Sequence, residues 1–146
     1  MSSRHRAIVL DANILIRLVL GQRVRQLVLD HADRVGFFTP EVAYADARTY
    51  LPGLLVRRGI DPGSAMSVLD GFESIVHSVE ADVYRRARRA ALARIEMRDP
   101  ADWPVVATAL VLGCPIWTED QDFFGTGVPT WTTDRVLLYL NTSDQP

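Results

Sequence analysis

Short apolar segments rich in β-branched residues alternate with longer segments of helical periodicity, and this alternation constrains the fold most. The segment 7–10 is typical of a buried strand in a parallel sheet, because it is a continuous apolar run. Similar segments lie at 35–38, 74–77, 115–118 and, more weakly, 128–131. Helices are predicted at 13–20, 23–34, 39–58, 61–69, 80–97 and 132–140. A further helix is predicted to begin between residues 99 and 104 and to end at 112. This order predicts a three-layer α/β/α fold with a central, mostly parallel sheet of four to five strands.

Two of the predicted helices carry further signals. Thr39 is a candidate N-cap for the helix 39–58, and Pro40 suits its first turn. The helix 80–97 is expected to bury one stripe of side chains, namely Val83, Ala87, Ala90, Ala91 and Ile95. Five arginines fall largely outside that stripe: Arg85, Arg86, Arg88, Arg89 and Arg94. Such a charge run is typical of a solvated helix face, and an RNA-contacting face is the alternative.

The length of 146 residues suits one domain and is short for two, and no linker interrupts the chain. We therefore expect a single domain over residues 1–146, with a polar tail at 141–146. The apolar stretch 7–20 contains Asp11, Asn13 and Arg17, which argues against a membrane span or a signal peptide. The single cysteine, Cys114, excludes an internal disulfide and a cysteine-based zinc site. These features predict a soluble, cytoplasmic protein.

All 16 basic residues are arginine, and the chain contains no lysine. This absence excludes P-loop enzymes, Schiff-base enzymes and protein kinases, which all need a lysine amine. The formal net charge of −2 gives no overall attraction for nucleic acid. Any such binding would need local arginine patches or bound cations.

Acidic residues are concentrated where the predicted fold would bring them together. Asp11 ends the first strand, and Glu119, Asp120 and Asp122 follow the strand 115–118. Asp99 and Asp102 begin the helix that leads into that same strand, so they should lie at its carboxyl edge. Open α/β sheets place their ligands at this edge, and Asp46 in the helix after the second strand can reach it.

Several carboxylates at one place repel one another, by about 4 kcal/mol for a pair 4 Å apart at an effective dielectric near 20. The site must therefore bind a cation, pair with arginine or keep a carboxyl group protonated. Oxygen ligands without histidine or cysteine favour Mg²⁺ or Mn²⁺. Such ions activate water and hold phosphate oxygens during phosphoryl transfer.

Three motifs, taken together and in this order, resemble the PIN domain family of ribonucleases. They are VLDANIL at 9–15, DPADWPVVATAL at 99–110 and WTEDQDFF at 117–124. The resemblance covers nearly the whole chain and implies a PIN-like fold. It also implies that Mg²⁺ or Mn²⁺ positions a water for attack on an RNA phosphodiester.

The resemblance implies a role for each matching residue. Asp11, Asp102 and Asp120 would bind metal, with Asp122 and Asp99 as additional acids. The second acid of the family is usually a glutamate; Asp46 is the best match by position and Glu41 is the competing candidate. Asp46 would join Asp11, Asp102 and Asp120 as a catalytic acid. Thr118 would orient a carboxylate or a water, and Asn13 would form a hydrogen bond near Asp11.

Structural roles are the alternative for several of these acids. Asp11 and Asp99 are good helix caps, Asp102 could complete a capping pair with Asp99, and Asp122 could stabilise a turn. Glu41 lies in a first helical turn, where a negative charge is favourable in any case.

Many bacterial PIN proteins of this size resemble the toxins of VapBC-type toxin–antitoxin pairs. The resemblance therefore implies an RNA substrate, a small antitoxin partner and a homodimer, with no membrane. A catalytically weak or inactive PIN-like scaffold that binds a protein or nucleic acid is the alternative, because aspartate replaces glutamate at position 46.

Overall fold

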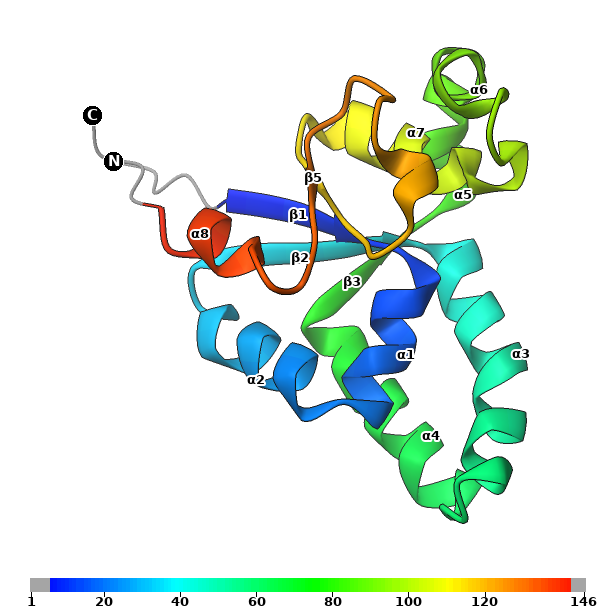
Figure 1. Ribbon diagram of the computed structural model, residues 1–146, viewed down its shortest axis with the longest axis vertical. Coiled ribbons are helices and arrows are strands. Elements are labelled where there is room, and N and C mark those ends of the chain that lie inside the picture. The colour runs from blue at the N-terminus through cyan, green and yellow to red at the C-terminus, as the bar shows by residue number, and fades with distance from the viewer. Residues whose placement is uncertain (1–5, 143–146) are drawn as a thin grey trace.

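Five strands form one sheet at the centre of the protein (Figure 1). In the computed structural model, which describes residues 6–142, they are β1 (Arg6–Leu10), β2 (Val35–Pro40), β3 (Val76–Val79), β4 (Ile116–Trp117) and β5 (Thr130–Trp131). Their order across the sheet is β3-β2-β1-β4-β5, and every neighbouring pair is parallel. The predicted α/β fold with a largely parallel sheet is confirmed.

The helices lie on both faces of this sheet (Figure 1). They are α1 (Ala12–Leu20), α2 (Gln22–His31), α3 (Glu41–Arg57), α4 (Pro62–Gly71), α5 (Ala81–Tyr84), α6 (Arg88–Ile95), α7 (Trp103–Leu112) and α8 (Val136–Leu140). Short 3₁₀ turns are η1 (Phe72–Ser74), η2 (Arg85–Ala87), η3 (Pro100–Asp102) and η4 (Gln121–Phe123). Helices α1 to α4 cover one face, and α5 to α7 cover the other.

Each face of the sheet has its own hydrophobic core. Along β1, Ile8 and Leu10 pack into the core beneath α1 to α4, and Val9 packs into the core beneath α7. All three side chains are fully buried, as expected for a central strand of a parallel sheet. Helix α7 ends at Gly113, whose left-handed backbone (φ 65°) stops the helix before β4.

Several local predictions were wrong or displaced. The third strand, predicted at 74–77, is β3 (Val76–Val79), and the last helix, predicted at 132–140, is α8 (Val136–Leu140). The helix predicted at 80–97 is divided by η2, and because a 3₁₀ turn has fewer residues per turn it shifts the buried face. Tyr84 is therefore buried and Ala90 exposed, while Ala91 and Ile95 are buried as predicted. Thr39 is not an N-cap, because β2 continues to Pro40 and the Thr39 hydroxyl donates instead to the Leu10 carbonyl at 2.7 Å.

The strand order positions a candidate site. The chain leaves β1 toward β2 and β3 on one side and returns to β4 and β5 on the other, so β1 and β4 flank a topological switch point. Ligand sites of open parallel sheets form at the carboxyl ends of such strands. Residues 143–146 of the predicted tail lie outside the described residues. No helix in the described part of the chain has the length and apolar character that a membrane crossing requires.

Candidate metal centre

Asp11 is the first residue after β1, and it is nearly completely buried. Its backbone amide continues the sheet by donating to the Trp117 carbonyl at 3.3 Å. Its side chain caps α1, since Oδ1 accepts from the Ile14 amide at 3.0 Å. Burial raises the pKa of Asp11 to about 6, although hydrogen bonds from Thr118 and Ile14 oppose this effect. The cap holds the carboxyl group at the switch point.

Thr118 connects the ends of β1 and β4. Its hydroxyl donates to Asp11 Oδ2 and accepts from the Asp120 amide at 2.9 Å. The side chain is fully buried, so this hydroxyl has no access to bulk water. One hydroxyl therefore orients one acidic side chain and anchors the backbone of another acid.

Asp102 carries the least compensated charge of the site. Its Oδ2 is buried and has no hydrogen-bond partner among the described residues. Burial, followed by the charges of Asp99, Asp120, Asp11 and Asp122, raises the pKa of Asp102 to about 7. A carboxyl group in these surroundings is stabilised by a proton or by a cation.

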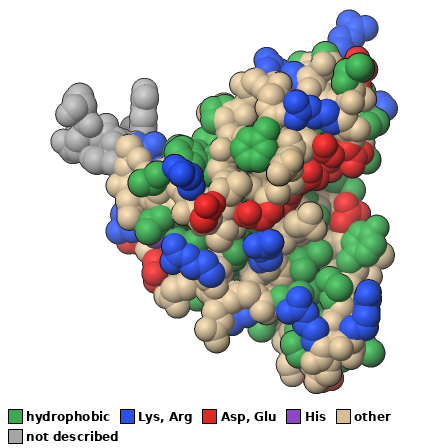
Figure 2. Space-filling model, viewed as in Figure 1, with side chains coloured by type: hydrophobic (Ala, Val, Ile, Leu, Met, Phe, Trp, Pro, Cys, Tyr) green, Lys and Arg blue, Asp and Glu red, His purple; other side chains and the backbone are tan. Residues whose placement is uncertain are grey.

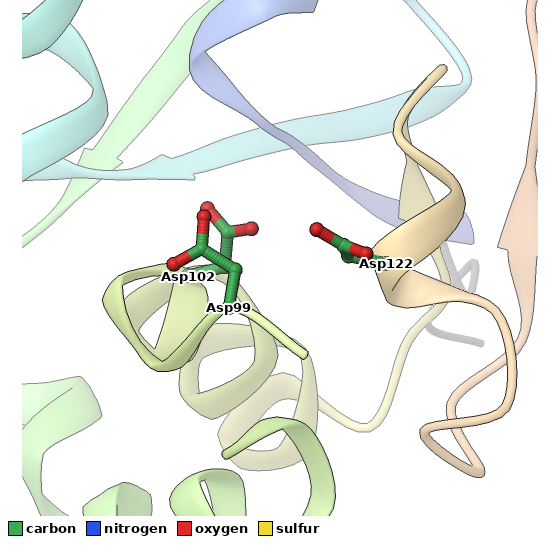
Figure 3. A group of neighbouring side chains, drawn as sticks. All are labelled: Asp99, Asp102 and Asp122. Carbon is green, nitrogen blue, oxygen red and sulfur yellow. The ribbon is translucent and has the colours of Figure 1, made fainter. Parts of the chain in front are cut away.

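Two chain segments bring three carboxyl groups together: Asp99 caps η3, which ends at Asp102, and Asp122 lies in η4. One oxygen from each of them lies within 4.8 Å of the others. Figure 3 shows the carboxyl group of Asp122 facing those of Asp99 and Asp102 across a gap. Three carboxylates with an unpartnered buried oxygen fit a hard divalent cation, which prefers oxygen ligands.

A cleft of about 80 Å³ adjoins this group. Its acidic lining consists of Asp11, Asp46, Asp102 and Asp120, with Asn13 beside them. None of these carboxylates, nor those of Asp99 and Asp122, forms an ion pair with a described residue. Acidic side chains form a band across this face of the molecule (Figure 2).

The structure distinguishes between Asp46 and Glu41, the two candidates for the second acid of the site. Asp46 on α3 lines the cleft and is exposed. Glu41 is used elsewhere, since its Oε1 accepts from the Ala81 amide at 3.0 Å at the start of α5. The position therefore favours Asp46.

Other sequence candidates have mixed outcomes. Glu119 points to the segment before α8, where its Oε2 accepts from the Thr133 amide at 2.6 Å. Asn13 lines the cleft, but its side chain forms no hydrogen bond with any described residue. Asp120 Oδ1 accepts from the Asp122 amide at 2.9 Å, so Asp120 both lines the cleft and shapes η4.

Sequence reasoning missed the arginines that hold the acidic loop between β4 and β5. Arg98 Nη1 donates to the carbonyls of Gln121 (3.2 Å), Asp122 (3.4 Å) and Phe124. A side chain on Gly125, whose φ is 89°, would collide with this guanidinium. Arg94 forms a similar bond to the Thr126 carbonyl at 2.8 Å, next to the positive-φ Gly127. The two glycines were the only sequence signal for this arrangement.

A family model described as PIN domain matches residues 9–141 of the chain. No curated protein matches the sequence. The fold is similar to that of PAE2754 from Pyrobaculum aerophilum, with a TM-score of 0.71 and 17% identity over 95% of this chain and 98% of the other.

Two further crystal structures have a similar fold. One is VapBC2 from Rickettsia felis bound to a DNA fragment from its promoter, with a TM-score of 0.65 and 12% identity over 86% of this chain and 98% of the other. The second is DNA-bound VapBC from Salmonella typhimurium, with a TM-score of 0.62 and 18% identity over 88% of this chain and 98% of the other.

Proposed function

The chain belongs to the PIN domain family, and on that premise we propose that it is a metal-dependent endoribonuclease that hydrolyses RNA phosphodiesters. The observation that carries the proposal is the group formed by Asp99, Asp102 and Asp122, in which Asp102 Oδ2 is buried without a partner. Repulsion among these groups is relieved when a divalent cation binds. The family match over residues 9–141 also supports a single domain over residues 1–146.

In this proposal Asp99, Asp102 and Asp122 hold Mg²⁺ or Mn²⁺, with Asp11 and Asp120 completing the acidic lining. The bound ion supplies Lewis acidity and lowers the pKa of water. Thr118 fixes the orientation of the Asp11 carboxylate, which lines the cleft. Asp46, exposed at the cleft, is placed to accept a proton from a water.

We also propose that the chain is the toxin of a toxin–antitoxin pair. Two proteins with a similar fold are VapBC complexes, which supports a small antitoxin as the partner of this chain. A homodimer that acts in the cytoplasm belongs to the same proposal. Expression of the chain should then arrest growth, and coexpression of an antitoxin encoded beside it should restore growth. Unimpaired growth with active, folded enzyme in the cell would contradict the toxin role alone.

The nuclease proposal is tested by cleavage of RNA with and without Mg²⁺ or Mn²⁺. Asp11→Asn and Asp102→Asn should each lower the cleavage rate by more than about 100-fold, because each removes a charge from the metal centre. Asp33→Asn is the matched control, since Asp33 is exposed and precedes β2, at the edge of the parallel sheet opposite the site. Cleavage at the wild-type rate by both site variants would refute the assignment.

A metal titration distinguishes the nuclease from the alternative of an inactive scaffold. Asp46 is exposed and one methylene shorter than glutamate, which is the observation that favours an inactive scaffold. Binding of Mn²⁺ at micromolar to millimolar concentration, lost in Asp102→Asn, supports the enzyme. Absence of Mn²⁺ binding at millimolar concentration supports the scaffold.

A further inference from the structure

Four arginines form a continuous exposed surface on η2 and the first turn of α6. We call Arg85, Arg86, Arg88 and Arg89 the arginine face. Together with Leu92, Ala93 and Glu96 they line a shallow hollow of about 580 Å³. Figure 2 shows basic side chains at the α6 end of the same face that carries the acidic band.

The arginine face is poorly neutralised by the protein itself. Arg85 pairs with Asp82 at 3.4 Å, but both side chains are largely exposed and the pair is weak. Arg86 and Arg89 form no hydrogen bond or ion pair with any described residue. Residues 80–98 contain six arginines and three acids, a local charge of +3 in a chain whose net charge is −2. The surface therefore attracts an anion in spite of the negative total.

The arginine face is connected to the metal centre by an aromatic side chain. The Arg88 guanidinium lies 5.3 Å from the centre of the Trp103 ring, and Tyr84 meets the same ring edge-on at 5.6 Å. Trp103 directly follows Asp102 and is only partly buried. Trp103 therefore lies between Asp102, which lines the cleft, and Arg88 of the arginine face.

We propose that the arginine face binds the phosphates of an RNA strand on one side of the bond to be cleaved. This inference rests on the proposed nuclease function. Guanidinium groups bind phosphate through paired hydrogen bonds, and single strands are bound by basic surfaces combined with aromatic rings. RNA explains both the unpaired arginines and the aromatic link to the cleft, whereas an acidic polypeptide explains only the arginines.

Binding of a fluorescein-labelled, mixed-sequence single-stranded RNA by fluorescence anisotropy tests the inference. All proteins carry Asp102→Asn, so that the probe is not cleaved, and Mg²⁺ is present. Arg86→Gln with Arg89→Gln is the test variant, since neither side chain supports the fold. Arg57→Gln with Arg58→Gln is the charge-matched control, because the C-terminal end of α3 lies at the opposite end of the molecule from α6 (Figure 1).

The test variant should bind RNA about tenfold more weakly than the parent, to a similar extent for probes of different sequence. The slope of log K against log salt concentration should become shallower by about 1.4, since each phosphate contact on a single strand contributes about 0.7. The control variant should match the parent in both respects.

Equal affinity and equal slope for the parent and the test variant would overturn the inference, as would an equal loss in the control. Polyglutamate and unlabelled RNA of equal charge are then compared as competitors for the labelled probe. If polyglutamate displaces the probe equally well, the ligand is an acidic protein and the inference is overturned. The nuclease function is judged separately, in the protein with Asp102 intact. Binding through the arginine face without any cleavage would refute the nuclease, and only the RNA-binding role of the arginine face would stand.

Discussion

At the scale of single residues, Asp11 shows that a structural and a functional role can coincide. Oδ1 caps α1 and Oδ2 accepts from Thr118, yet a carboxylate has about four acceptor positions, so two hydrogen bonds do not exhaust it. The cap removes the rotational freedom of the side chain. The same bonds that stabilise the helix therefore hold the charge at the edge of the cleft.

Thr118 gives a prediction at this scale. Thr118→Val keeps the shape of the side chain but removes the hydroxyl, which leaves Asp11 Oδ2 and the Asp120 amide without their partner. We expect a loss of about 1–3 kcal/mol in the free energy of unfolding, measured by urea denaturation. Thr108→Val is the matched control, since this buried hydroxyl donates only to a carbonyl of its own helix, at 2.7 Å. A loss no larger in Thr118→Val than in Thr108→Val would contradict the role assigned to this hydroxyl.

Asp102 gives the opposite prediction for stability. Asp102→Asn removes a charge whose neighbours are all acidic, so at pH 8 the metal-free variant should be more stable than wild type by about 1 kcal/mol. The same variant should bind Mn²⁺ about 10–100-fold more weakly by calorimetry. Asp33→Asn should change neither quantity. A variant that is less stable than wild type at pH 8 would show that the Asp102 charge is already compensated.

At the scale of elements, the segment between β4 and β5 is held in shape from outside by Arg98. Its guanidinium donates hydrogen bonds to backbone carbonyls along and just after η4. Arg98→Ala should therefore make the backbone that carries Asp122 more mobile. We expect faster amide hydrogen exchange over 120–126 and weaker Mn²⁺ binding, while global stability changes by less than about 1 kcal/mol because Arg98 is exposed. Arg58→Ala, at the exposed C-terminal cap of α3, controls for the lost charge. Unchanged exchange at 120–126 would contradict this positioning role.

The elements that the sequence predicts well are those with a local signal. The strand at 7–10 was predictable because burial on both faces of the sheet requires a continuous run of apolar residues. The helix end at Gly113 was predictable because a positive φ favours glycine. The approach of Asp11 and Asp120 followed from the topology of a parallel sheet, which brings strand ends to one edge. The contacts of Arg98 had no such trace, because they depend on the path of an irregular loop. The use of Glu41 as a cap for α5 depends in the same way on how distant segments meet.

At the scale of the whole molecule, the net charge of −2 conceals a separation of charge. Acids gather in the cleft at the switch point, and arginines gather on η2 and α6. A bound divalent cation would partly neutralise the cleft. Both regions would then favour a polyanion, although the total argues against one.

The acidic centre should also govern how the stability of the metal-free protein depends on pH. The folded-state pKa values of Asp11 (about 6) and Asp102 (about 7) lie above the ordinary value of 3.8, so the folded protein binds these protons more tightly than the unfolded chain. Their contribution is complete below pH 3.8 and is lost as pH rises through 6 and 7. We expect the free energy of unfolding to fall by about 2 kcal/mol between pH 5 and pH 8, after discounting for the partial exposure of Asp102.

Urea denaturation at the two pH values, with and without Mg²⁺, checks this expectation. Mg²⁺ should restore the lost stability at pH 8 and have little effect at pH 5, where protons occupy the same oxygens. Because Asp102→Asn removes one of the two groups, its pH dependence should be weaker than that of wild type, while Asp33→Asn should retain the full dependence. Greater stability of the metal-free protein at pH 8 than at pH 5 in wild type, with the same trend in Asp102→Asn, would mean that other groups dominate. The two raised carboxyl groups would then not govern the pH dependence of stability.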